Sequence, residues 1–275
     1  MQLACKACSG ARPTSYRKTI KVQDTFSPMK FTDTGTLINW QLDDIHIIQP
    51  LHDKADGGSR GGVYLCIPNF EELSPPFAIK HGEYRITPCD SDLPHQKNLT
   101  APADVNWGTV EVITDWQELT EANNKTLTVS TRIRAVSETA LVRPGFHPYF
   151  SISPDSVIDI ADTHIEVAAL PHDSLRVHHA KSPTAPVKLS TADYTVSMAC
   201  NISPVQDDLA LAFGIWSDKK AEYVCIEPII GKQPGPDDLP TPLTLQQDEE
   251  LVMVFTIQAE RLKLKLADTF LNSNC

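Results

Sequence analysis

The chain has 275 residues, enough to bury a substantial core in one large domain or two small ones. Its net charge of −11, with no basic stripe to offset it, argues against nucleic acid as the main partner. No stretch approaches the ~20 apolar residues needed to span a membrane, so we expect no membrane-embedded segment. With 21 prolines against 12 glycines, helices should be scarce.

The N-terminal residues differ from the rest of the chain. Residues 1–23 carry five basic residues and no acidic residue, but no apolar run long enough for a signal peptide. We therefore predict a flexible tail at 1–23, with a transit segment as the alternative, and a single domain over 24–275. The seven cysteines are odd in number and scattered, which favours reduced thiols and a cytoplasmic location over a disulfide framework.

Alternation of apolar and polar residues recurs from residue 37 to residue 257 and predicts strands. In chain order these strands fall at 37–42, 45–48, 109–116, 126–136, 158–160, 164–167, 194–198, 222–226 and 251–257. The runs at 109–116 and 126–136 enclose a turn at 121–125 and predict a β-hairpin. Half-polar strands are typical of antiparallel sheets with one solvated face, so the fold class is all-β, as a sandwich or a barrel.

Four short motifs combine titratable residues with glycine, proline or aromatic neighbours. They are Arg60-Gly61-Gly62, His81-Gly82-x-x-Arg85, His147-Pro148-Tyr149-Phe150 and Ile226-Glu227-Pro228. In this order they resemble the galactose mutarotase-like family of aldose 1-epimerases. The first two motifs look more like its hexose-6-phosphate mutarotase branch. The resemblance extends from about residue 25 to residue 265 and implies the family's large antiparallel β-sandwich.

Glu227 and His147 are the candidate catalytic residues. Glu227 lies between Ile226 and Pro228 at the end of an apolar strand, where burial would raise the pKa of its carboxyl group. Without context, a solvent-exposed glutamate and a structural histidine are the commoner interpretations. The resemblance implies instead that Glu227 is a general base and His147 a general acid. An imidazole suits that role because its unperturbed pKa is near ~6.5.

The same resemblance implies that His81 binds the sugar near its ring oxygen. It also implies that Arg60 contacts a 6-phosphate, and Arg85 could join it, because planar guanidinium groups bind two oxygens at once. Asp193 is the candidate for the family's aspartate that binds sugar hydroxyls. The chain departs from the branch in having Val63-Tyr64 after Arg60-Gly-Gly and no tryptophan soon after Arg85.

The predicted function is therefore interconversion of the α and β anomers of a hexose or hexose 6-phosphate by acid–base ring opening. The alternative is a non-catalytic carbohydrate-binding or regulatory protein on the same fold. Ring opening requires no metal, nucleotide or redox cofactor, and none is expected. Cys5-x-x-Cys8 lacks the partners of a zinc site, and His178-His179 is expected in a loop.

Overall fold

The protein is built almost entirely from antiparallel strands, which confirms the all-β prediction. The computed structural model describes residues 29–54, 58–70, 77, 79–90, 96–103, 105–180, 186–204, 208–219, 221–233 and 239–262. The tail predicted at 1–23 lies outside these ranges. Within them the only helical element is the short 3-10 turn η1 (Val167–Ala169), and no helix is long and apolar enough to cross a membrane.

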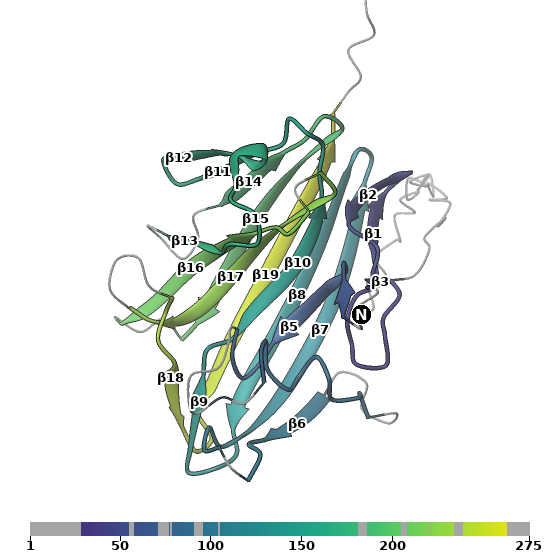
Figure 1. The fold of residues 1–275 in the computed structure, drawn as a ribbon. Coiled ribbons are helices and arrows are strands. Elements are labelled where there is room, and N and C mark those ends of the chain that lie inside the picture. Colours follow the sequence, from purple (N-terminus) through teal and green to yellow (C-terminus); the bar gives the residue numbers. More distant parts are fainter. Residues whose placement is uncertain are drawn as a thin grey trace, which may run out of the picture.

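Two large sheets are stacked into a sandwich (Figure 1). The eight-stranded sheet has the spatial order β12 (Thr163–Glu166), β11 (Val157–Ile160), β14 (Val187–Ser190), β15 (Tyr194–Ser203), β19 (Glu250–Arg261), β8 (Asn124–Ala135), β7 (Thr109–Glu121) and β6 (Gln96–Thr100). The seven-stranded sheet has the order β1 (Trp40–Leu42), β2 (Ile45–Ile48), β10 (Gly145–Ser151), β17 (Tyr223–Lys232), β16 (Leu209–Trp216) and β13 (Arg176–His179), and β5 (Val63–Cys66) also pairs with β10.

Two further pairs are short. They are β9 (Thr139–Val142) with β18 (Leu243–Gln246), and β3 (His52–Asp53) with β4 (Ser59–Arg60). The second pair matters for the site because it carries Arg60.

The strands of the eight-stranded sheet follow the sequence pattern. The hairpin predicted around 121–125 is confirmed: β7 and β8 pair over their whole length, from Val110↔Ala135 to Glu121↔Asn124. In β15 and β19, buried and exposed residues alternate strictly. Their apolar sides form one continuous core with the other sheet, where Phe146 of β10 stacks on Phe255 of β19 with ring centroids 4.8 Å apart.

The central strands of the seven-stranded sheet lack this alternation. Almost every residue of β10, β16 and β17 is buried, because one face lies on the core and the other lies under loops. The expectation that His178-His179 lies in a loop was wrong. Both residues belong to β13, where they pair with Phe213 and Ala212 of β16.

Glycines in the Arg60-Gly61-Gly62 motif let the chain pass close to neighbouring backbone. Both have positive φ, +93° at Gly61 and +76° at Gly62. A Cβ added at Gly61 would lie 2.3 Å from the Pro50 carbonyl oxygen, and one at Gly62 would lie 2.5 Å from the Leu37 carbonyl oxygen. Neither oxygen can move without shifting the backbone that carries it, so the motif positions Arg60 through a backbone that only glycine allows.

We expect Gly62→Ala to lower the free energy of unfolding by about 2 kcal/mol or more, because it adds a backbone clash to an unfavourable φ. Gly35→Ala is a matched control: Gly35 also has positive φ (+71°), but its nearest neighbour is the Cys89 sulfur at 3.3 Å. Urea unfolding of both variants measures the difference. Equal losses would show that φ alone, and not the contact with Leu37, requires glycine.

Candidate active site

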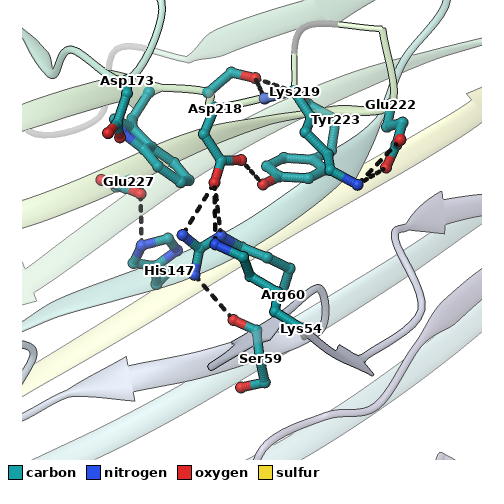
Figure 2. A network of polar contacts seen from close by, with 12 residues as sticks. Lys54, Ser59, Arg60, His147, Asp173, Asp218, Lys219, Glu222, Tyr223 and Glu227 are labelled. Carbon is teal, nitrogen blue, oxygen red and sulfur yellow. Dashed lines mark hydrogen bonds and ion pairs between the residues drawn. The ribbon is translucent and has the colours of Figure 1, made fainter. Parts of the chain in front are cut away.

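Strand register brings the two predicted catalytic residues together. His147 of β10 pairs with Tyr64 of β5, and Glu227 of β17 pairs with Gly214 of β16. Between the two central strands, Gly145 lies opposite Ile229 and Tyr149 opposite Cys225, which places His147 opposite Glu227. His147 Nε2 and Glu227 Oε1 are 2.9 Å apart (Figure 2).

These residues form the floor of a cavity of about 490 Å³, within the ~300–1,000 Å³ that small-molecule sites occupy. The cavity is lined mainly by polar and aromatic side chains: Ser59, Arg60, Tyr64, Phe70, Lys80, His81, Arg85, His147, Tyr149, Asp173, Leu175, Trp216 and Glu227. Five of the six predicted site residues are therefore brought together, from positions as far apart in sequence as Arg60 and Glu227.

Glu227 and His147 are both almost fully buried, with side-chain exposures of 2% and 5%. Burial raises the pKa of Glu227 well above its usual value, although the Lys80 charge and the Cys225 thiol oppose the shift. Burial also lowers the pKa of His147 well below its usual value, and the nearby charges of Arg85 and Arg60 lower it further. Both shifts favour the uncharged forms of the two groups.

Their contact leaves hydrogen-bonding capacity unused. Glu227 Oε1 and His147 Nδ1 are buried atoms with no hydrogen-bond partner in the structure. The 2.9 Å approach of Glu227 Oε1 to His147 Nε2 is an ion-pair contact that leaves Nδ1 unengaged. Buried polar atoms in this condition are rare and destabilising. A hydroxylic ligand in the cavity could satisfy Glu227.

The His147 ring is fixed by aromatic neighbours. It packs against Tyr64 and against Tyr149, with centroid distances of 4.7 and 4.8 Å and interplanar angles of 26° and 17°. The Trp216 and Phe70 rings lie farther out, each 6.3 Å away. This packing leaves the imidazole little freedom to rotate.

His81 has a different protonation from His147. Its Nδ1 hydrogen bonds to the Phe70 carbonyl oxygen, which can only accept, so Nδ1 carries the proton and Nε2 is an acceptor. Burial and the neighbouring His147 lower the pKa of His81 to about 2. The residue has φ of +62°, and Gly82 follows it with its Cα against the Ile67 carbonyl. His81 is therefore a neutral hydrogen-bond acceptor.

The two predicted arginines line the cavity in different states. Arg60 hydrogen bonds through Nε and Nη2 to Asp218 Oδ2, at 3.1 and 3.0 Å (Figure 2). Its guanidinium carbon also lies over the Trp216 ring, 5.3 Å from the ring centroid. Arg85 lies over the Tyr64 ring at 5.7 Å, and its buried Nε has no hydrogen-bond partner. Lys80 adds a third positive charge to the lining.

Searches of known proteins match the fold and nothing finer. No protein-family model and no curated protein sequence matches the chain. Among solved structures, the Slr1438 protein of Synechocystis sp. PCC 6803 has a TM-score of 0.58 at 11% identity, over 85% of this chain and 91% of that chain. A putative mutarotase (YeaD) from Salmonella typhimurium has a TM-score of 0.53 at 13% identity, over 84% and 85%. A galactose 1-epimerase from Lactobacillus acidophilus NCFM has a TM-score of 0.50 at 13% identity, over 84% and 90%.

The fold is that of aldose epimerases. At these identities the likeness establishes the mutarotase-like β-sandwich, which confirms the predicted fold.

Asp193 is not among the residues that line the cavity, in contrast to the prediction that it lies with the other five site residues. Asp193 lies in the turn between β14 and β15 of the eight-stranded sheet, where its backbone carbonyl accepts from the Leu262 amide. The aspartate that lines the cavity is Asp173, which accepts a 3.0 Å hydrogen bond from Trp216 Nε1. The segment Thr191-Ala-Asp-Tyr194 gave no information on the location of Asp193. A polar turn next to a strand has the same sequence pattern whether or not it lies near a cavity.

Three side chains with metal-binding chemistry also meet in the cavity region. The ligand atoms of His147, Cys225 and Glu227 lie within 4.8 Å of one another. An imidazole, a thiol and a carboxylate suit zinc-like ions. Acid–base ring opening needs no such ion, and the prediction of a metal-free reaction stays a prediction.

Replacing Glu227 by glutamine should stabilise the protein. The pKa of Glu227 is higher in the folded protein than in the unfolded chain, where it is ~4.3. The free energy of unfolding of the wild-type protein therefore falls as pH rises from the unfolded-state pKa through the folded-state pKa. Glutamine carries no such penalty, so the melting temperature of Glu227→Gln should exceed that of wild type by a margin that grows with pH.

Thermal melts between pH 5 and pH 9 measure this margin, and Glu222→Gln, at an exposed carboxylate, is the control. A margin that is constant or shrinks with pH would contradict the raised pKa of Glu227.

Proposed function

We propose that the protein is an aldose 1-epimerase that interconverts the α and β anomers of a hexose or hexose 6-phosphate. The observation that supports this best is the buried pair of Glu227 and His147, 2.9 Å apart on the floor of an open cavity. A proton acceptor and a proton donor that share one proton suit a reaction that removes one proton and adds another in the same step.

The reaction begins with the shared proton on His147. Glu227 removes the proton from the C1 hydroxyl while His147 protonates the ring oxygen, so the C1–O5 bond breaks and a C1 carbonyl forms. The proton now lies on Glu227. Burial assists both transfers, because it makes Glu227 a stronger base and protonated His147 a stronger acid than in water.

Ring closure on the other carbonyl face reverses the two transfers. Rotation about the C1–C2 bond turns the carbonyl, the C5 hydroxyl adds to C1 as His147 accepts its proton, and Glu227 returns a proton to the carbonyl oxygen. The pair ends in its starting state. The reaction requires no redox change and no added cofactor.

Other groups in the cavity would hold the sugar. Tyr64 and Trp216 line the cavity and would pack against the C–H surface of a pyranose. The same two rings hold the guanidinium groups of Arg85 and Arg60 in place. His81 would accept a hydrogen bond from a sugar hydroxyl through Nε2, because its Nδ1 is bound to Phe70. Asp173 would accept another in the place first assigned to Asp193.

The four cysteines within the described residues, Cys66, Cys89, Cys200 and Cys225, are free thiols. This agrees with a reducing compartment, and we propose a cytoplasmic location on that ground. A carbohydrate-binding protein without turnover would use the same aromatic walls. It would have no need for a buried acid–base pair, whose unsatisfied polar atoms destabilise the fold.

Glu227→Gln and His147→Ala should each reduce anomer exchange by about 10²-fold or more, because each removes one of two coupled proton transfers. Exchange NMR on α-glucose, galactose and glucose 6-phosphate measures the rate against the uncatalysed background. His81→Ala is the matched control, since it removes an imidazole 4.9 Å from that of His147. It should raise KM more than it lowers kcat.

Near wild-type exchange in a folded Glu227→Gln variant would remove the proposed mechanism. Sugar binding without exchange in the wild-type protein would favour the carbohydrate-binding alternative.

The pH profile should fall on both sides. At acid pH the pair takes up a second proton and has no base, and at alkaline pH it loses its only proton and has no acid. The lowered pKa of His147 places the acid limb below ~6.5, and the raised pKa of Glu227 places the alkaline limb above ~4.3. Measurement of kcat/KM from pH 4 to pH 10 tests this, and an alkaline limb missing from the profile of a stable enzyme would contradict a shared proton.

A further inference from the structure

Arg60 is held on two sides before any ligand arrives. Its Nε and Nη2 donate to Asp218 Oδ2, and its guanidinium plane lies over the Trp216 ring. A third bond runs from Nη1 to the Ser59 carbonyl at 3.1 Å. Figure 2 shows Asp218 above the guanidinium group and Ser59 below it.

These contacts already use three of the guanidinium donors. A guanidinium group has five N–H donors, and it binds phosphate most strongly through two parallel bonds from one edge. Asp218 occupies the edge formed by Nε and Nη2, and its negative charge lies where a phosphate would bind that edge. Ser59 takes one donor of Nη1, which leaves one donor on Nη1 and one on Nη2.

Asp218 is itself fixed in place. Its Oδ1 accepts from the Tyr223 hydroxyl, and Lys54 lies 3.9 Å from its Oδ2 (Figure 2). The turn that carries it is tied down at both ends: Ser217 Oγ donates to the Tyr223 carbonyl at 2.8 Å and accepts from the Lys219 amide at 3.1 Å. The carboxylate therefore cannot swing away without breaking several hydrogen bonds.

We propose that Asp218 is a specificity-determining residue, an internal counter-ion that occupies Arg60 and biases the site toward uncharged aldoses over their 6-phosphates. The inference rests on the proposed epimerase function. This reverses the role first expected of Arg60. In this chain the positive charge of Arg60 is neutralised by Asp218, and the guanidinium group packs over Trp216. A phosphate bound beside Arg60 would also lie next to the negative charge of Asp218. Like charges in such contact discriminate strongly between ligands.

The test is a double-mutant cycle on Asp218 and Arg60. In Asp218→Asn the guanidinium edge is released, so the ratio of kcat/KM for glucose 6-phosphate to that for glucose should rise about tenfold or more. The gain should come through a lower KM for the phosphate ester, with kcat for that ester little changed. In the double variant Asp218→Asn/Arg60→Ala the gain should disappear, because Arg60 is the group that was freed.

Two further variants separate this effect from general causes. Asp248→Asn removes the same unit of charge from an exposed ion pair with Arg134, and it should leave the ratio unchanged. Asp218→Glu keeps the carboxylate and should keep the preference for the uncharged sugar.

An unchanged or lower ratio in Asp218→Asn, or a gain that persists in the double variant, would overturn the proposal. If neither sugar is exchanged by the wild-type protein, the epimerase function fails. The counter-ion role is then decided by ³¹P NMR titration with inorganic phosphate. Tighter binding by Asp218→Asn than by wild type, lost in the double variant, would support it, and equal binding would refute it.

Discussion

The antiparallel register between β10 and β17 is the constraint on which the site depends. With Gly145 opposite Ile229 and Tyr149 opposite Cys225, the side chains of His147 and Glu227 have no alternative but to meet on the same face. A slip of one residue between the two strands would turn one of these side chains toward the core and separate the pair, since successive residues of a strand point to opposite faces. Gly145 helps to hold this register: a Cβ there would lie 2.7 Å from the Pro228 carbonyl oxygen, so the two strands approach too closely for any other residue.

Burial at this face gives the pair its chemistry at the expense of stability. The same desolvation that raises the pKa of Glu227 and lowers that of His147 also leaves Glu227 Oε1 without a partner. A core of apolar side chains at these positions would be more stable, as in the layer beneath, where Phe146 and Ile226 face the other sheet. The Lys80 charge moderates the desolvation cost to Glu227, whereas the charges of Arg85, Arg60 and Lys80 all oppose protonation of His147.

Sequence reasoning predicted the fold class, which the structure confirms, and five of its six candidate site residues line one cavity. What it missed has two separate physical causes. Alternation identified β7, β8, β15 and β19, whose outer faces are exposed. It overlooked β16, in Leu209–Trp216, because that strand is covered on both faces and reads as an unbroken apolar run. The site was found through short motifs whose glycines and prolines record close backbone approach. Asp173 and Asp218 lie in loops without such marks, so only the folded chain could show that they face the cavity or Arg60.

The proposed site divides between the central strands and the elements around them. The strands β10 and β17 fix His147 and Glu227, the pair proposed to act at C1, whereas the turn after β16 supplies Asp218 and the short strand β4 supplies Arg60. Because the charge near Arg60 depends on a turn residue, a single substitution there can alter the anion affinity of the site without moving the acid–base pair. A protein of net charge −11 can thus contain a cavity lined by Arg60, Lys80 and Arg85 and still neutralise one of them locally. The net charge of the protein therefore does not predict the charge of its ligand. The residues in direct contact with each charged side chain are more informative.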